Sequence, residues 1–158
     1  MTDPARAWLA EALATKDLEK VQANMPVAGI RIGDARNHVR SARMLAGDDP
    51  ALAIAACHDA IRKAVTAHML AAGLRPRGGE GAHRIVLAYA RHVLTNVVTP
   101  ADLTEAEGIR RDRVLAEYGD YPSSQFNADH VNAAADVAER IVNAVASELA
   151  RKAKNKRS

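Results

Sequence analysis

The chain has 158 residues, which is enough for one domain with a buried core and too few for a second full domain. Apolar residues make up 48% of the sequence but aromatic residues only 3%, a balance that favours close helix packing over sheets. The net charge of +3 is modest and partly concentrated in the basic tail 151–158, so composition alone does not call for nucleic acid. We expect that tail to be a solvated, frayed end.

Capping residues and proline mark three helices in the first half of the chain. Asp3, followed by Pro4, predicts the start of the first helix, which should run to about Met25 before a proline and a glycine interrupt it. A second helix is predicted over 33–47. A third, over 49–73, begins with another Asp-Pro pair and stops at a glycine.

The third predicted helix is amphipathic, with apolar residues at three- and four-residue steps. Cys57 falls inside this stripe, where a thiol behaves as a small apolar group. On another face Asp59 is placed to pair with Lys63. His58 and His68 border the stripe, and we interpret them as hydrogen-bonded packing residues.

The second half predicts up to three more helices. One follows the loop 74–82, the next begins at the capping residue Thr99 and should reach about Tyr118, and the last is capped by Asn127 and carries an apolar stripe of period 3.6. No stretch long enough to form a strand alternates between apolar and polar residues with period two. The prediction is therefore an all-α, up-and-down bundle of about five to six helices, forming one domain over 1–158.

Three features of the sequence indicate the cellular compartment of the protein. The single cysteine excludes an internal disulfide. No apolar run approaches the roughly 20 residues that a membrane helix needs, and the N-terminal sequence lacks the basic-then-apolar layout of a secretion signal. We expect a cytoplasmic protein that is neither exported by that route nor inserted in a membrane.

The loop that precedes the fourth helix combines glycine and arginine. Its glycines would let backbone N–H groups approach a phosphate, and Arg75 and Arg77 offer bidentate donors. It also contains Glu80 and lacks the lysine and hydroxyl residue of a Walker loop, so a plain helix connection is the alternative. His83 follows this loop and is the strongest functional candidate among six histidines, with a helix cap or a surface position as the alternative. The spacing of the six predicts no metal site.

The densest polar segment is the end of the fifth helix. Arg110, Arg113 and Glu117 share one face, Arg111 lies beside them, and Tyr118 comes next along the chain. One interpretation is a solvated face in which Arg113 pairs with Glu117. The other is a surface that recognises phosphate or a carboxylate of a partner.

Three stretches together resemble the HEPN superfamily, helical-bundle proteins of prokaryotic toxin–antitoxin, defence and RNA-processing systems. They are HDAIRKAVTAHMLAAGLRP, GGEGAHRIVLAYA and RRDRVLAEYGD, within roughly residues 50–150. The last resembles the family's motif of an arginine followed, four to six residues later, by a histidine. In active members these two residues form a metal-independent ribonuclease site, usually where two subunits meet.

The chain departs from that motif at the histidine. Four residues separate Arg113 from Tyr118, and no histidine occurs over 114–120. A tyrosine with a reference pKa of about 10 is a poor base at neutral pH. The resemblance implies that Arg113 binds phosphate, that Glu117 orients it and Tyr118 donates a hydrogen bond, and that His83 supplies the missing proton.

The leading hypothesis is a HEPN-like protein that acts by binding RNA, a partner protein or both in a toxin–antitoxin or defence system. The partners implied are a second copy of the chain and a nucleotidyltransferase-type antitoxin, without a cofactor. One alternative is a metal-independent ribonuclease toxin with an altered active site. The other is a structural helical module without a nucleic-acid role.

Overall fold

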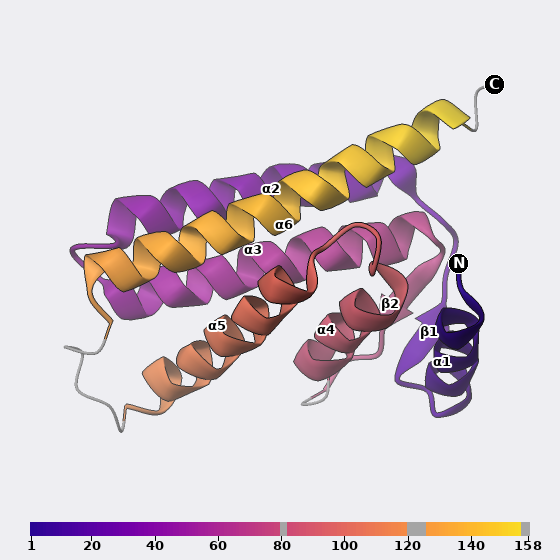
Figure 1. Ribbon diagram of the computed structural model, residues 1–158, viewed down its shortest axis with the longest axis horizontal. Coiled ribbons are helices and arrows are strands. Elements are labelled where there is room, and N and C mark those ends of the chain that lie inside the picture. Colours follow the sequence, from indigo (N-terminus) through magenta and orange to yellow (C-terminus); the bar gives the residue numbers. More distant parts are fainter. Residues whose placement is uncertain (80–81, 120–125, 156–158) are drawn as a thin grey trace.

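The computed structural model describes residues 1–79, 82–119 and 126–155, which contain six helices and one two-stranded sheet (Figure 1). In chain order the elements are α1 (Asp3–Ala14), β1 (Leu18–Lys20), α2 (Met25–Leu45), α3 (Pro50–Ala71), β2 (Leu74–Pro76), α4 (Ala82–Val93), α5 (Pro100–Tyr118) and α6 (Ala128–Asn155). The predicted all-α bundle is confirmed.

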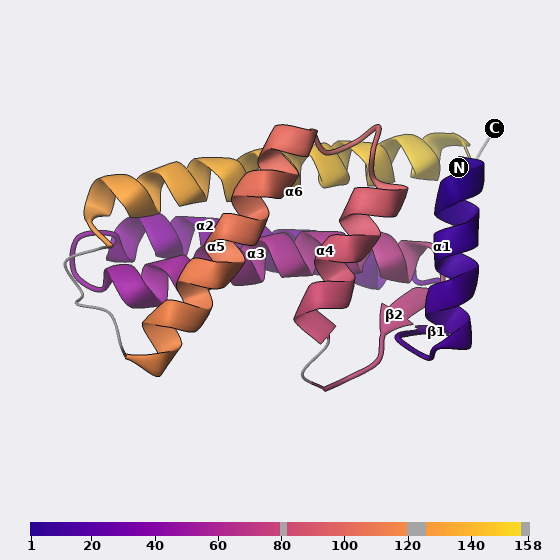
Figure 2. The same cartoon turned by 60° about the horizontal axis from the view of Figure 1, so that its bottom comes forward.

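The helices form two layers. The long helices α2, α3 and α6 lie side by side, and α1, α4 and α5 cross them on one face (Figures 1 and 2). The turn after α2 reverses the chain, so α3 runs antiparallel to α2 and α6 runs in the same direction as α3 (Figure 1). This layering brings α3 into contact with both α4 and α5.

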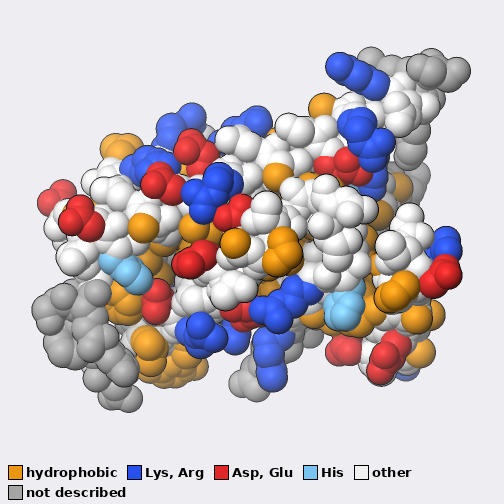
Figure 3. All heavy atoms as spheres, in the orientation of Figure 1, with side chains coloured by type: hydrophobic (Ala, Val, Ile, Leu, Met, Phe, Trp, Pro, Cys, Tyr) orange, Lys and Arg blue, Asp and Glu red, His pale blue; other side chains and the backbone are white. Residues whose placement is uncertain are grey.

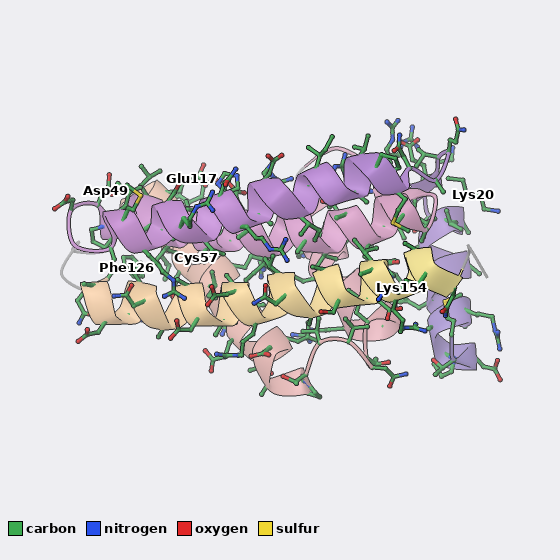
Figure 4. The ribbon with its side chains drawn as sticks, turned by 90° about the horizontal axis from the view of Figure 1, so that it is seen from above. Lys20, Asp49, Cys57, Glu117, Phe126 and Lys154 are labelled. Carbon is green, nitrogen blue, oxygen red and sulfur yellow. The ribbon has the colours of Figure 1, made fainter. Side chains whose placement is uncertain are left out.

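The core is centred on α3, twelve of whose residues are buried. Many facing residues on α2 and α6 are alanines, which let helix backbones approach closely. At the edge of this layer Arg43 on α2 binds Asp136 and Glu139 on α6, at 2.8 and 3.1 Å. Viewed from above, Asp49, Glu117 and Phe126 lie toward one end of the bundle and Lys20 and Lys154 toward the other (Figure 4).

The predicted boundary between the first two helices is wrong. The first helix ends at Ala14 instead of running to about Met25, and α2 begins at Met25, well before the expected start at residue 33. The side chain of Asn24 accepts a hydrogen bond from the Val27 amide and caps α2. Pro26 then lies in the first helical turn, where a missing N–H breaks no hydrogen bond.

The segment between α1 and α2 contains strand β1, which pairs antiparallel with β2 in the register Leu18↔Pro76 to Lys20↔Leu74. Each strand has three residues, too few for a period-two pattern to be visible in the sequence. Gly73, at φ 75°, makes the turn from α3 into β2, and its carbonyl accepts a hydrogen bond from the Val21 amide.

Three local expectations also need correction. The cap of α1 is Thr2, not Asp3. Asp59 pairs with Arg62 at 3.3 Å, and Lys63 pairs with Asp34 instead. The predicted frayed tail is helical over 151–155, where it continues α6, and its last three residues lie outside the described residues.

The caps predicted at Asp49, Thr99 and Asn127 are confirmed, each accepting a backbone N–H from three residues ahead. Within the described ranges, no helix combines the length and apolar content that crossing a membrane requires.

Candidate functional site

The site is built where α3, α4 and α5 meet. His58 lies in the middle of α3 on its buried stripe, and only 2% of it is exposed. His83 lies in the first turn of α4 and is half-buried. Crossing of the two helices brings His58 Nε2 to 2.9 Å from His83 Nδ1, with ring centroids 5.1 Å apart. The pair therefore joins residues that are 25 positions apart in the sequence.

The surroundings of the pair determine where its protons lie. His58 Nδ1 is buried and has no hydrogen-bond partner in the described residues. A buried N–H without an acceptor is rarer in proteins than a buried acceptor without a donor. We therefore place the His58 proton on Nε2, which donates to His83 Nδ1. His83, when neutral, then carries its own proton on Nε2, the nitrogen not engaged by His58.

Burial and positive charge keep both histidines neutral at physiological pH. Burial lowers the pKa of His58 to about 4, and His83 in its protonated form and Arg113 act in the same direction. Burial also lowers the pKa of His83, followed by the charges of Arg113 and Arg62. Asp59 raises both pKa values but is outweighed. The electrostatic potential at the histidine pair is therefore positive.

Arg113 on α5 supplies much of that potential and is only partly neutralised. Its Nη1 lies 3.4 Å from Glu117 Oε2, which confirms the predicted ion pair. Its Nε is buried and, in the described residues, finds no acceptor. A guanidinium carries five N–H donors in a fixed fork, so the observed contact leaves donor capacity unused. The side chain is 28% exposed, so an anion could reach guanidinium N–H groups other than the buried Nε.

Two further arginines complete the arrangement. Arg62 lies one turn after His58 on α3 and pairs with Asp59. Arg110 lies one turn before Arg113 and pairs with Glu107 at 3.0 Å, and its charge also lowers the pKa of His83. We call His58, Arg62, His83, Arg110 and Arg113 the histidine–arginine cluster. Basic side chains gather over the region of α4 and α5, with acidic ones among them (Figure 3).

The structure thus brings together three of the residues proposed from the sequence, Arg110, Arg113 and His83, with Glu117 at their edge. Tyr118 is 73% exposed at the end of α5, and Arg111 is exposed on the same helix. Tyr118 makes no hydrogen bond with Arg113 within the described residues. The tyrosine that replaces the expected histidine is therefore not joined to the histidine–arginine cluster.

The glycine–arginine loop is engaged elsewhere. Arg75 lies in β2 and forms an ion pair with Glu19 on β1. The Arg77 amide donates to the Asp17 carbonyl, and its side chain lines a shallow pocket between the α1–β1 turn and Gly78. Glu80 and the following glycine lie outside the described residues. The ion pair explains Arg75 as a support of the sheet, whereas Arg77 contributes a backbone hydrogen bond next to it.

His58 and Arg62 are the members that sequence reasoning missed. His58 was interpreted as a packing residue, and it is buried and hydrogen-bonded, but its partner is a second histidine. A signal was present, because a four-residue step puts Arg62 on the same face of α3 as His58. No group of three or more metal-binding side chains is assembled in the part of the chain that the structure describes.

The resemblance of the three motifs to the HEPN superfamily stays a prediction. Comparison of the chain with protein-family models, curated proteins and solved structures finds no match.

Proposed function

We propose that the protein binds RNA through the histidine–arginine cluster. The observation that carries this proposal is the unused donor capacity of Arg113, whose partly exposed side chain lies beside a neutral histidine pair and makes a single ion pair. A phosphate oxygen could accept from Arg113, and in the proton arrangement derived above His83 Nε2 offers a further N–H. Phosphate recognition by such donors fixes a nucleic-acid backbone without reading its bases.

A chain of phosphates fits this surface better than a single small anion does. The three arginines come from two helices, and each retains partial exposure while paired within its own helix. Weak surface ion pairs of this kind exchange readily for contacts with a phosphate. The resemblance to RNA-processing HEPN proteins also favours RNA as the ligand.

The binding test measures the affinity of the full chain for a fluorescent single-stranded RNA at several salt concentrations. For Arg113→Ala we expect a loss of affinity of about 10-fold and a salt slope reduced by about one, because one phosphate contact is removed. Arg6→Ala is the matched control, since Arg6 also pairs within its own helix but lies on α1. Equal RNA affinity of the Arg113→Ala variant and the wild type would exclude this site.

Metal-independent cleavage of RNA is the second candidate, and the His58–His83 pair favours it. Such cleavage needs one group to take the proton of the ribose 2′-hydroxyl and another to protonate the leaving oxygen, while a cation stabilises charge on the phosphate. In this scheme the pair takes the opposite tautomer, in which His83 Nδ1 donates to His58 Nε2 and the free His83 Nε2 takes the proton of the 2′-hydroxyl. Solvent water protonates the leaving oxygen, and Arg113 is the cation.

Cleavage is tested on mixed RNA with His83→Gln and with Arg113→Ala. An enzyme should lose about 100-fold or more in rate with His83→Gln while RNA binding falls little. Cleavage at an unchanged rate would remove His83 from the mechanism, and absence of cleavage by the wild type would leave binding as the function. A toxin should also impair growth when expressed alone and lose that effect with Arg113→Ala.

The proposal includes a protein partner beside the site. Val114 and Tyr118 are exposed apolar residues on α5, the helix that carries Arg113. A second copy of this chain is the partner we propose there, with a nucleotidyltransferase-type antitoxin as its neutralising protein. Sedimentation of the wild type and of Val114→Ser tests the dimer, and a monomeric wild type at micromolar concentration would contradict it.

A further inference from the structure

A second polar arrangement lies near the other end of α3, between α3, α4 and α6. His68 is buried there, and its two ring nitrogens have different partners. Lys152 Nζ lies 2.8 Å from His68 Nε2, and Tyr89 Oη lies 2.9 Å from His68 Nδ1. None of these three residues belongs to the histidine–arginine cluster, so they have no part in the proposed RNA site.

The direction of the hydrogen bonds follows from the chemistry of lysine. A lysine ammonium has three donors and no acceptor, so Lys152 donates to His68 Nε2. His68 must then carry its proton on Nδ1, which donates to the Tyr89 oxygen. Burial lowers the pKa of His68 to about 4, in agreement with a neutral ring. The Tyr89 hydroxyl therefore accepts this hydrogen bond, and its own hydrogen has no acceptor among the described residues.

All three side chains line a cavity of about 820 Å³, a size typical of small-molecule sites. One wall is apolar and includes Leu9 of α1 together with Val93 and Val97. The lining also includes Glu148, Arg151 and Lys152 of α6, where two cations pair with one carboxylate and leave one net positive charge. The cavity thus has an apolar side, a cationic side and a donor that lacks an acceptor.

We propose that this cavity binds a small amphipathic monocarboxylate. The carboxylate accepts from the Tyr89 hydroxyl and lies beside Arg151 and Lys152, whose excess charge it balances. The hydrocarbon part packs against Leu9, Val93 and Val97. A neutral ligand of the same shape leaves the excess charge unbalanced, and a dianion meets repulsion from Glu148.

Trp8 provides a direct readout, since it is the single tryptophan and stacks on His92, a residue of the cavity wall, at a centroid distance of 4.9 Å. Titration of the full chain with sodium octanoate should change the tryptophan fluorescence saturably. 1-Octanol should bind at least about 10-fold more weakly, because it lacks the charge. Tyr89→Phe should weaken octanoate binding by about 5–10-fold through loss of one hydrogen bond.

Arg151→Gln gives a second variant at an exposed position that should not disturb folding. It should weaken the binding of octanoate and leave that of octanol unchanged, whereas Arg140→Gln, on the same helix but outside the cavity, should alter neither. Equal affinity for octanoate and octanol, or no saturation of the wild type below about 10 mM octanoate, would overturn the proposal. RNA binding by the Arg151→Gln variant should remain unchanged, which separates this site from the proposed RNA site.

Discussion

Two buried histidines should make the stability of the protein fall in mild acid. Burial lowers the pKa of His58 and of His68 from 6.5 to about 4. The unfolded chain therefore takes up a proton at each residue near pH 6.5, and the folded chain only near pH 4. The stability from these neutral rings is present above pH 6.5 and is lost as the pH falls through that window, by up to about 3 kcal/mol for each.

Urea unfolding at intervals between pH 7 and pH 4 measures this effect. A double variant, His58→Gln with His68→Gln, is the control, because it removes both titrating rings while the carboxylates still titrate. Its unfolding free energy should fall less steeply between pH 6.5 and 5 than that of the wild type. Parallel curves would show that neither ring has the lowered pKa described above.

At the level of residues, the sequence predicted three of the five members of the histidine–arginine cluster, His83, Arg110 and Arg113. The helical spacing of Arg110, Arg113 and Glu117 was sufficient to place them on one face, because that spacing is local. The choice of His83 rested on its place after a glycine-rich loop. The contact of His83 with His58 depends on how α3 and α4 cross, and a pattern within either helix carries no information about that crossing.

At the level of elements, two glycines differ in whether their position could hold a larger residue. Gly33 lies in the interior of α2 on an exposed face, and a Cβ added there meets nothing within 4 Å. Gly73 has a φ of 75°, and its added Cβ would lie 3.0 Å from the Val21 carbonyl oxygen of the segment that follows β1.

Alanine at these two positions should therefore change stability in opposite directions. Gly33→Ala should raise the free energy of unfolding by about 0.5–1 kcal/mol, since alanine is the better helix former. Gly73→Ala should lower it by about 1–3 kcal/mol through an unfavourable φ and a backbone clash. Chemical denaturation of both variants measures the two changes, and Gly78→Ala, in open space, is the control. A neutral Gly73→Ala would contradict the turn geometry.

The helix boundaries explain where sequence reasoning on elements succeeds. Caps at Asp49, Thr99 and Asn127 were predicted because each is a local hydrogen bond between a side chain and the backbone three residues ahead. The end of α1 was missed because Lys16, and not a glycine, takes the left-handed conformation after it, at φ 64°. The strands were missed because β1 is held by β2, a partner from beyond α3.

For the whole molecule, the two layers should differ in local stability. Helix α3 has twelve buried residues, whereas α1 has two, Ala5 and Ala12. Partly buried Trp8 packs its ring on His92 and edge-on against Tyr89, which adds aromatic contacts at the edge of α4. Opening of α1 exposes less apolar surface than opening of α3, so it costs less free energy.

Native-state hydrogen exchange should therefore show α1 exchanging first and α3 last, with α3 amides protected close to the free energy of global unfolding. Because Thr2, the cap of α1, and Ala5 and Leu9 within it line the cavity next to Tyr89, a ligand held there should slow exchange in α1 more than in α5. Octanoate is the ligand to use, with octanol as its control. Protection of α1 equal to that of α3 without ligand would mean that α1 belongs to the same cooperative unit as the long-helix layer.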